Sequence, residues 1–307
     1  MAPENVPAVV TNSLSQADAI AWAPDARTSE LPRRIRVIGR PTFSIATIFA
    51  GACNLLQYSD LFYTLSLFRL KVRYKQSILG WLWAALQPLA LMGIYTFVFA
   101  HVTKVNTGGA AYPAFVFCGL LPWIFFSGSI ANAVHGMVAY PTLLTKMYFP
   151  REIIPLSYLA AGVVDFLIAS VILMGIIASY RITPTWNLLY ALPILVVLGA
   201  FAAAVALFFA AVHVRFRDVG LALPFLLQIW MFATPVVYSL QSVPVRLRGL
   251  YVLDPVASAI DMFRSAVLFG RAPNLFALGL TCGSTIVALL LAYAYFKASE
   301  AVMADLI

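Results

Sequence analysis

Long apolar runs recur along most of this chain, and short polar segments separate them. A helix that crosses the hydrocarbon core of a bilayer needs about twenty mostly apolar residues. By this criterion we place six membrane spans at residues 82–102, 114–134, 153–179, 188–212, 221–239 and 274–296. The pattern predicts an all-α integral membrane protein with six transmembrane helices.

The segment before the first span predicts an amphipathic helix that lies in the cytoplasmic interface. From Asp60 to Lys75 such a helix would carry apolar residues on one side, namely Leu61, Leu65, Phe68 and Val72. Arg69 falls near that side, and we expect its side chain to extend toward water. The basic residues would anchor the helix to anionic lipid; they are Arg69, Lys71, Arg73 and Lys75. The alternative is an ordinary charged flank.

Residues 240–272, between the fifth and sixth spans, contain apolar pieces that are each too short to cross a membrane. They predict a pair of short re-entrant or interfacial helices, with a break at the Asp254-Pro255 step.

The two ends of the chain differ from the middle. Residues 1–56 predict a cytoplasmic tail that is largely disordered. Its apolar patch at 43–56 is shorter than the roughly twenty residues of a span, so we expect interfacial contact, with an extra span as the alternative. No apolar core follows an N-terminal positive cluster, so we expect no cleaved signal peptide. We assign residues 57–300 to the transmembrane domain and 301–307 to a cytoplasmic C-terminal end.

Composition supports a membrane protein, because 62% of the residues are hydrophobic and 10% are charged, against roughly 25% charged in soluble domains. With both termini inside, fourteen of the twenty Lys and Arg residues fall on the cytoplasmic side. This distribution follows the positive-inside rule, so the net charge of +8 requires no nucleic-acid partner. The three scattered cysteines have no metal-site spacing.

Residues that could perform chemistry are few. Asp165 is the one acidic residue well inside a predicted span, and an acid there is either functional or a hydrogen-bonded structural group. His101, His135 and His213 lie at span ends. An intramembrane acyl- or glycosyltransferase would have to use Asp165, His101 or His213. The chain has no glycine-rich phosphate loop of the Walker type.

Aromatic residues are abundant, with 22 Phe, 14 Tyr and 6 Trp. Any single ring is expected to face lipid or to pack between helices. As a set they also predict a conduit in which sugar rings stack on aromatic faces. The candidate conduit residues are Tyr95, Trp123, Phe125, Phe126, Trp230, Phe232 and Tyr238.

Two cytoplasmic loops have the composition of contact surfaces. The first, residues 135–152, is too polar to span and too apolar for a free linker, which suggests a short helix that docks on a partner. The second, at 214–219, contains Arg215, Arg217 and Asp218. The alternative for both is an ordinary basic inside loop.

Five segments of the chain, in this order and spacing, resemble the permease subunit of an ABC-2 type exporter. They read LKVRYKQSILGWLWAALQP, GLLPWIFFSGSI, LLTKMYFPREIIPLS, VRFRDV and ATPVVYS. The likeness covers residues 60–300 and is closest to exporters of O-antigen and related cell-surface polysaccharides or polyol phosphates.

This resemblance implies a bacterial inner-membrane protein with two permease copies and two copies of a separate ATPase subunit. ATP and Mg would bind to that partner, and this chain would hold no cofactor. The coupling helix would draw on Tyr140, Pro141, Lys146, Tyr148, Phe149, Pro150, Arg151 and Glu152. The short helices after span five would form an outer gate. The substrate would be a lipid-linked glycan; a lipid, a drug or a teichoic-acid-like polymer is the alternative.

Overall fold

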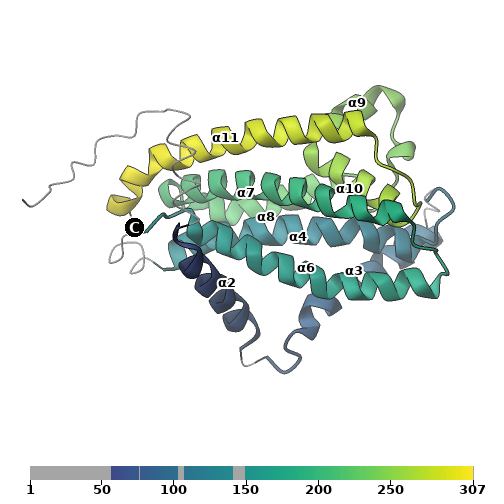
Figure 1. The fold of residues 1–307 in the computed structure, drawn as a ribbon, viewed down its shortest axis with the longest axis horizontal. Coiled ribbons are helices and arrows are strands. Elements are labelled where there is room, and N and C mark those ends of the chain that lie inside the picture. Colours follow the sequence, from purple (N-terminus) through teal and green to yellow (C-terminus); the bar gives the residue numbers. More distant parts are fainter. Residues whose placement is uncertain (1–56, 76, 103–106, 141–148, 307) are drawn as a thin grey trace, which may run out of the picture. The chain divides into compact units, whose positions relative to one another are not determined.

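All regular secondary structure in the described residues is helical (Figure 1). The computed structural model describes residues 57–75, 77–102, 107–140 and 149–306. Five helical segments are long and apolar enough to cross a membrane, namely Leu82–Phe99, Tyr112–Ala139, Ile153–Ser179, Trp186–Arg215 and Leu275–Glu300. They correspond to the first four predicted spans and the sixth, so the prediction of an all-α, multi-pass membrane protein is confirmed.

These segments are built from five α-helices and two short extensions. The α-helices are α3 (Leu82–Thr96), α4 (Tyr112–Ala139), α6 (Ile153–Ser179), α7 (Ala191–Arg215) and α11 (Leu275–Leu306). A π-helical turn, η1 (Phe97–Val102), continues α3, and a 3-10 turn, η2 (Trp186–Tyr190), precedes α7.

The fifth predicted span is shorter than expected. Helix α8 (Asp218–Ala233) is apolar but has only 16 residues. It ends because Thr234 is extended, with φ −97° and ψ 142°. Pro235 follows, and a proline disfavours the helical conformation of the residue before it. The prediction of a span to residue 239 is therefore wrong at its C-terminal end.

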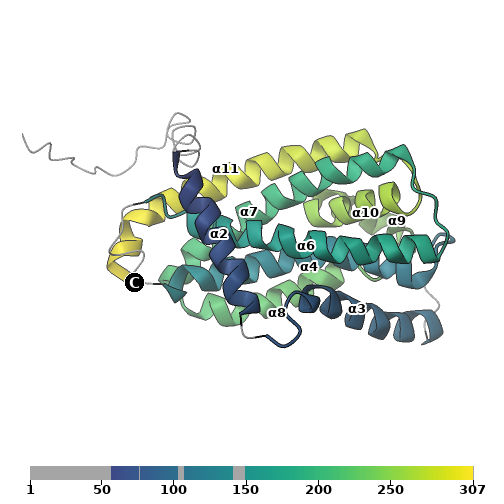
Figure 2. The ribbon, with the colours of Figure 1, turned by 60° about the horizontal axis from the view of Figure 1, so that its bottom comes forward.

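Helix α4 is the central element, with α3, α6, α7, α8 and α10 packed around it (Figures 1 and 2). Its side chains are buried along most of its length. Glycines bring α4 and α6 close together. A Cβ at Gly162 would collide with Ser129 Oγ, and a Cβ at Gly136 would collide with the Tyr158 ring. Small residues at helix contacts are typical of packing in membranes, where close approach replaces the hydrophobic effect.

The predicted helix before the first span is present as α2 (Ser59–Tyr74). It packs against α6 (Figure 2). Its predicted apolar side is correct only in part. Leu61 and Leu65 pack against the core, whereas Phe68 and Val72 are 44% and 46% exposed.

The side chain of Arg69 is buried, so the expectation that it extends toward water is wrong. Its guanidinium carbon lies 4.3 Å from the ring centroid of Tyr140 and 4.5 Å from that of Tyr158. Attraction between a cation and aromatic faces explains why this arginine faces the bundle.

Two short helices follow α8, as predicted. They are α9 (Val245–Leu253) and α10 (Pro255–Val267), and a 3-10 turn, η3 (Leu240–Ser242), precedes them. The break falls at Asp254, whose Oδ1 accepts a hydrogen bond from the Val256 amide at 3.0 Å and caps α10. Helix α10 packs against α4 and α7.

Several predictions fall on residues outside the described ranges. These are the cytoplasmic tail with its interfacial patch, and most of the proposed coupling helix, including Pro141, Lys146 and Tyr148.

Candidate functional site

A cavity of about 500 Å³ lies between α2, α3, α4, α6 and α8. We call it the aromatic cavity, because its lining includes Tyr74, Trp83, Tyr95, Trp123, Phe125 and Phe166. Its volume falls in the range of small-molecule sites, about 300–1,000 Å³. Three of the predicted conduit residues, Tyr95, Trp123 and Phe125, therefore lie together at one site.

Polar side chains stand among these rings. Gln87, Asn132 and Gln228 line the aromatic cavity from three different helices. Ser129 also lines it, and its buried hydroxyl has no hydrogen-bond partner within the described part of the chain. The cavity thus offers amide and hydroxyl groups, which both donate and accept hydrogen bonds, beside flat apolar faces.

Asp165 of α6 lies at the side of the aromatic cavity that α2 covers. Its carboxylate forms an ion pair with Arg73 and accepts a hydrogen bond from the Tyr74 hydroxyl at 2.5 Å. Burial, and next the bond to Asp165, raise the pKa of Tyr74 to about 12. The Tyr74 ring also stacks on Trp81, with centroids 4.8 Å apart. The intramembrane acid is therefore held by two partners from α2.

The other candidate conduit residues lie elsewhere. Phe126 is fully buried and packs against Phe201 and Trp230. The Trp230 indole donates to Asp254 at 3.1 Å. Tyr238 donates to the Phe232 carbonyl at 3.0 Å, and the Phe232 side chain is 52% exposed. The structure gives Phe126 and Trp230 roles in packing and brings none of these four residues to the aromatic cavity.

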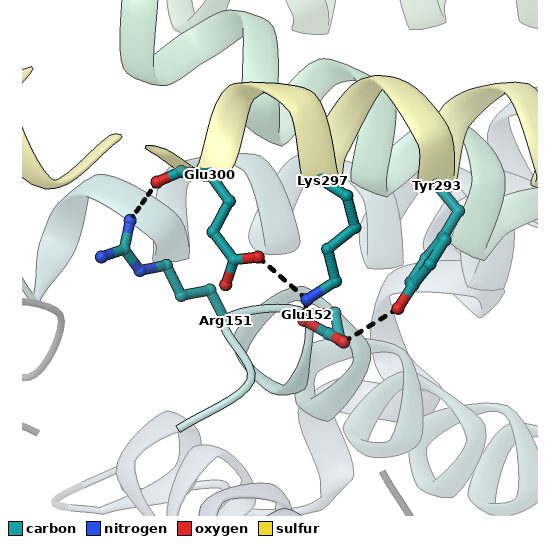
Figure 3. Close-up of polar contacts among 5 residues, drawn as sticks. All are labelled: Arg151, Glu152, Tyr293, Lys297 and Glu300. Atoms are coloured by element: carbon teal, nitrogen blue, oxygen red, sulfur yellow. Dashed lines mark hydrogen bonds and ion pairs between the residues drawn. The ribbon is translucent and has the colours of Figure 1, made fainter. Parts of the chain in front are cut away.

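A polar cluster joins the loop before α6 to the C-terminal helix α11 (Figure 3). We call it the Glu152 cluster. The Glu152 carboxylate is 1% exposed, and it accepts from Lys297 Nζ at 2.8 Å and from the Tyr293 hydroxyl at 3.2 Å. Lys297 also pairs with Glu300 at 2.9 Å, and Arg151 donates to the Glu300 carbonyl at 2.7 Å.

Sequence reasoning assigned Arg151 and Glu152 to a partner contact and did not find their link to α11. The two ends of the Glu152–Lys297 pair are 145 residues apart, so no local pattern connects them. Phe149 is buried and Pro150 is partly exposed. In this chain both side chains contact α11, because Arg151 donates to the Glu300 carbonyl and Glu152 pairs with Lys297.

The remaining predicted contact residues are more accessible. Arg215, Arg217 and Asp218 are exposed between the end of α7 and the start of α8. Lys71 and Lys75 are exposed on and after α2. Either group could contact lipid headgroups or another protein.

Of the histidines whose side chains the structure describes, neither His135 nor His213 is bonded to Asp165. His213 is buried and its Nδ1 accepts from the Gly220 amide at 3.1 Å, and its ring contacts that of His135. The side chain of His101 lies outside the described set. Within the described residues, no three His, Cys, Asp or Glu side chains are grouped as a metal site would require.

Comparison with known proteins identifies the family. The ABC-2 type transporter family matches residues 60–268. The O-antigen export system permease protein RfbA of Myxococcus xanthus is 32% identical over 166 residues, which cover 54% of this chain and 63% of that protein. Two proteins of the same name from Klebsiella pneumoniae are 33% and 31% identical over 168 and 167 residues, each covering 54% of this chain and 64% of the relative.

The matched region thus spans less than two thirds of these relatives. The family match, in contrast, covers α2 through α10 and includes both the aromatic cavity and the break at Asp254. The chain belongs to the ABC-2 type transporter family.

Proposed function

We propose that this chain is the membrane permease subunit of an ATP-driven exporter, and that its substrate is a lipid-linked polysaccharide of the O-antigen kind. The observation that carries the proposal is the aromatic cavity, in which Trp123, Phe125 and Tyr95 stand beside Asn132 and Gln228. Family membership and the printed names of the relatives support the same function.

A polysaccharide suits this lining for a physical reason. A sugar ring has C–H faces that pack on aromatic rings, and hydroxyls that pair with amide and hydroxyl side chains. The side chains of Gln87, Asn132 and Gln228 are exposed. A bound lipid or drug would cover these amides without pairing with them, and burying polar groups without partners costs free energy. The lining therefore favours a glycan over a small amphiphile.

An intramembrane transferase is the weaker alternative. Its candidate acid, Asp165, is paired with Arg73 and Tyr74, and its candidate base, His213, is bonded to Gly220. A general acid or base must reach the proton that it transfers. Neither group faces a second catalytic candidate among the described residues.

The complete exporter that we propose contains two copies of this chain and two copies of an ATPase subunit that binds ATP and Mg. It resides in the bacterial inner membrane with both termini in the cytoplasm. The ATPase would contact the loop between α4 and α6 and the exposed residues Arg215, Arg217 and Asp218.

The test replaces polar cavity residues with an apolar residue of similar size. Asn132→Leu with Gln228→Leu should reduce polysaccharide at the cell surface by tenfold or more, roughly the effect of losing two hydrogen-bonded contacts. The matched control is Ile229→Ala, because Ile229 neighbours Gln228 on α8, is 51% exposed and does not line the cavity. Unchanged surface polysaccharide in the double variant, at equal protein level, would contradict the proposal.

A further inference from the structure

A second cavity lies beside α10. Helices α9 and α10 lie toward the end of the bundle opposite the C-terminus (Figure 1). Its volume of about 380 Å³ is also that of a small-molecule site. We call it the arginine cavity, because Arg248, Arg264 and Arg271 line it. They come from α9, from α10 and from the loop after α10.

The charge of the arginine cavity is unbalanced. Asp261 is the one acidic residue in its described lining. None of the three arginines forms an ion pair with a carboxylate in the described ranges. A cavity with three cations and one anion attracts a negatively charged ligand.

Arg264 is the buried member of the group, with 2% of its surface exposed. Its Nη1 donates to the Pro235 carbonyl at 3.1 Å and its Nη2 to the Val236 carbonyl at 2.7 Å. Its guanidinium carbon lies 3.8 Å from the ring centroid of Phe115. These contacts orient the guanidinium but supply no negative charge.

The hydrogen bonds of Arg264 are also incomplete. A guanidinium has five N–H donors, and the buried Nε of Arg264 has no partner among the described residues. Burying a cation is costly unless an anion or enough acceptors compensate. A bound anion would supply both the missing acceptor and the missing charge.

The other two arginines are more accessible. Arg248 uses two donors on the Val243 and Gln241 carbonyls, at 2.9 and 2.7 Å. The Arg271 guanidinium lies 5.8 Å from the Phe269 ring centroid and makes no hydrogen bond to the described residues. Arg271 is therefore the guanidinium with most donors free for a ligand.

We propose that the arginine cavity binds an oxyanion of the phosphate type. Arginine pairs with phosphate and carboxylate through two parallel N–H bonds. Phosphate has more oxygens than carboxylate, so it can pair with arginines from several elements and with the nearby hydroxyls of Ser239 and Ser265 at once. The proposal does not depend on which polymer is exported.

Two sources could supply the phosphate: the headgroup of an anionic lipid, or a phosphate group that arrives from solution or on a substrate. Full-length protein in a zwitterionic detergent is titrated with inorganic phosphate at constant ionic strength, and its melting temperature is followed. In parallel, the protein is placed in nanodiscs of phosphatidylcholine alone or of phosphatidylcholine mixed with phosphatidylglycerol.

The variants separate binding at this site from general charge effects. Arg271→Gln should weaken the response about tenfold or more, the effect of losing one charge-assisted hydrogen bond, and Arg271→Lys should retain most of it. Arg246→Gln is the matched control, since Arg246 is exposed on α9 and does not line the cavity. Arg264 is not replaced, because it also donates to the carbonyls of Pro235 and Val236 in the chain after α8.

If inorganic phosphate stabilises the parent and Arg246→Gln but not Arg271→Gln, the site is open to soluble phosphate. The same variant pattern in nanodiscs that contain phosphatidylglycerol, without a response to inorganic phosphate, would identify a lipid headgroup as the ligand. No stabilisation in either medium, or equal loss in Arg271→Gln and Arg246→Gln, would overturn the proposal.

Discussion

Two arginines, Arg69 and Arg264, lie inside the helix packing with their guanidinium groups over aromatic rings. Arg69 is held between Tyr140 and Tyr158, where α2 crosses the bundle, and Arg264 lies over Phe115 of α4. Both guanidinium groups lie over aromatic rings, and Arg264 also donates to the carbonyls of Pro235 and Val236. At the scale of single residues, these cations fix how α2 and α10 attach to the bundle.

The contact of Arg264 with Gly119 gives the first prediction. A Cβ at position 119 would collide with Arg264 Nη2 and with the Val236 carbonyl oxygen. Gly119→Ala should lower the free energy of unfolding by about 1–3 kcal/mol, as overpacked sites do. The matched control is Gly128→Ala on the same helix, where a Cβ meets nothing within 4 Å.

Because alanine favours a helix over glycine, the control should remain within about 1 kcal/mol of the parent or become more stable. SDS titration in mixed micelles measures both variants. Equal stability of the two would show that Arg264 and the chain after α8 do not hold α4 as closely as the structure indicates.

The burial of Tyr74, together with its hydrogen bond to Asp165, predicts a pH effect. The pKa of Tyr74 is raised from 10.0 to about 12, so folding favours the protonated phenol. Its contribution to stability is complete below about pH 10 and is lost as the pH rises through 12. The stability advantage of the parent over Tyr74→Phe should therefore be constant up to pH 10 and then shrink.

Melting temperatures across this pH range provide the test. Tyr63→Phe is the control, because Tyr63 is exposed on the same helix and is not bonded to Asp165. A constant difference for Tyr74→Phe would contradict the shifted pKa.

At the scale of elements, the Glu152 cluster joins the start of α6 to α11 (Figure 3). Lys297→Met would leave the Glu152 carboxylate buried without its cation. The cost should be about 3 kcal/mol, the low end for a broken buried pair, because Lys297 remains partly exposed. Adding Glu152→Gln should recover part of the loss, since the uncompensated charge is then removed.

Glu300→Gln is the control for this prediction. Its pair with Lys297 is partly exposed, and such pairs contribute about 1 kcal/mol or less. A double-mutant cycle by SDS titration gives the coupling energy. If Lys297→Met and Glu300→Gln cost the same, the buried pair does not hold α11 to α6.

Hydropathy and the positions of helix-breaking prolines predicted the helices better than they predicted the contacts between helices. Apolar length located all the long helices, and the Asp254-Pro255 step located the break between α9 and α10. The same kind of signal at Pro235 could have ended α8 correctly. The ion pairs of Asp165 and Glu152 could not be predicted, because they depend on the register between helices distant in the chain.

The aromatic residues show the same limit. Trp123, Phe125 and Phe126 are consecutive or nearly so, yet the first two line the aromatic cavity and the third packs in the core. An apolar helix that is buried on almost every side gives no periodicity from which to choose the ring that faces a cavity. Only the packing of α3, α6 and α8 around α4 separates them.

At the scale of the whole molecule, α4 borders both cavities. Phe115 lines the arginine cavity, and Leu120 begins the α4 lining of the aromatic cavity. These residues are five positions apart, about 7.5 Å along the helix axis. A movement of α4 relative to the helices packed around it would therefore change both cavities.

The most direct test of this account is to purify the tagged full-length chain from its native membrane and to measure ATP hydrolysis and subunit composition. We expect an ATPase subunit in equal stoichiometry, and hydrolysis that requires both proteins. Cells that lack the chain should keep the polysaccharide inside. A chain that purifies alone, with surface polysaccharide unchanged by its deletion, would contradict the assignment as an export permease.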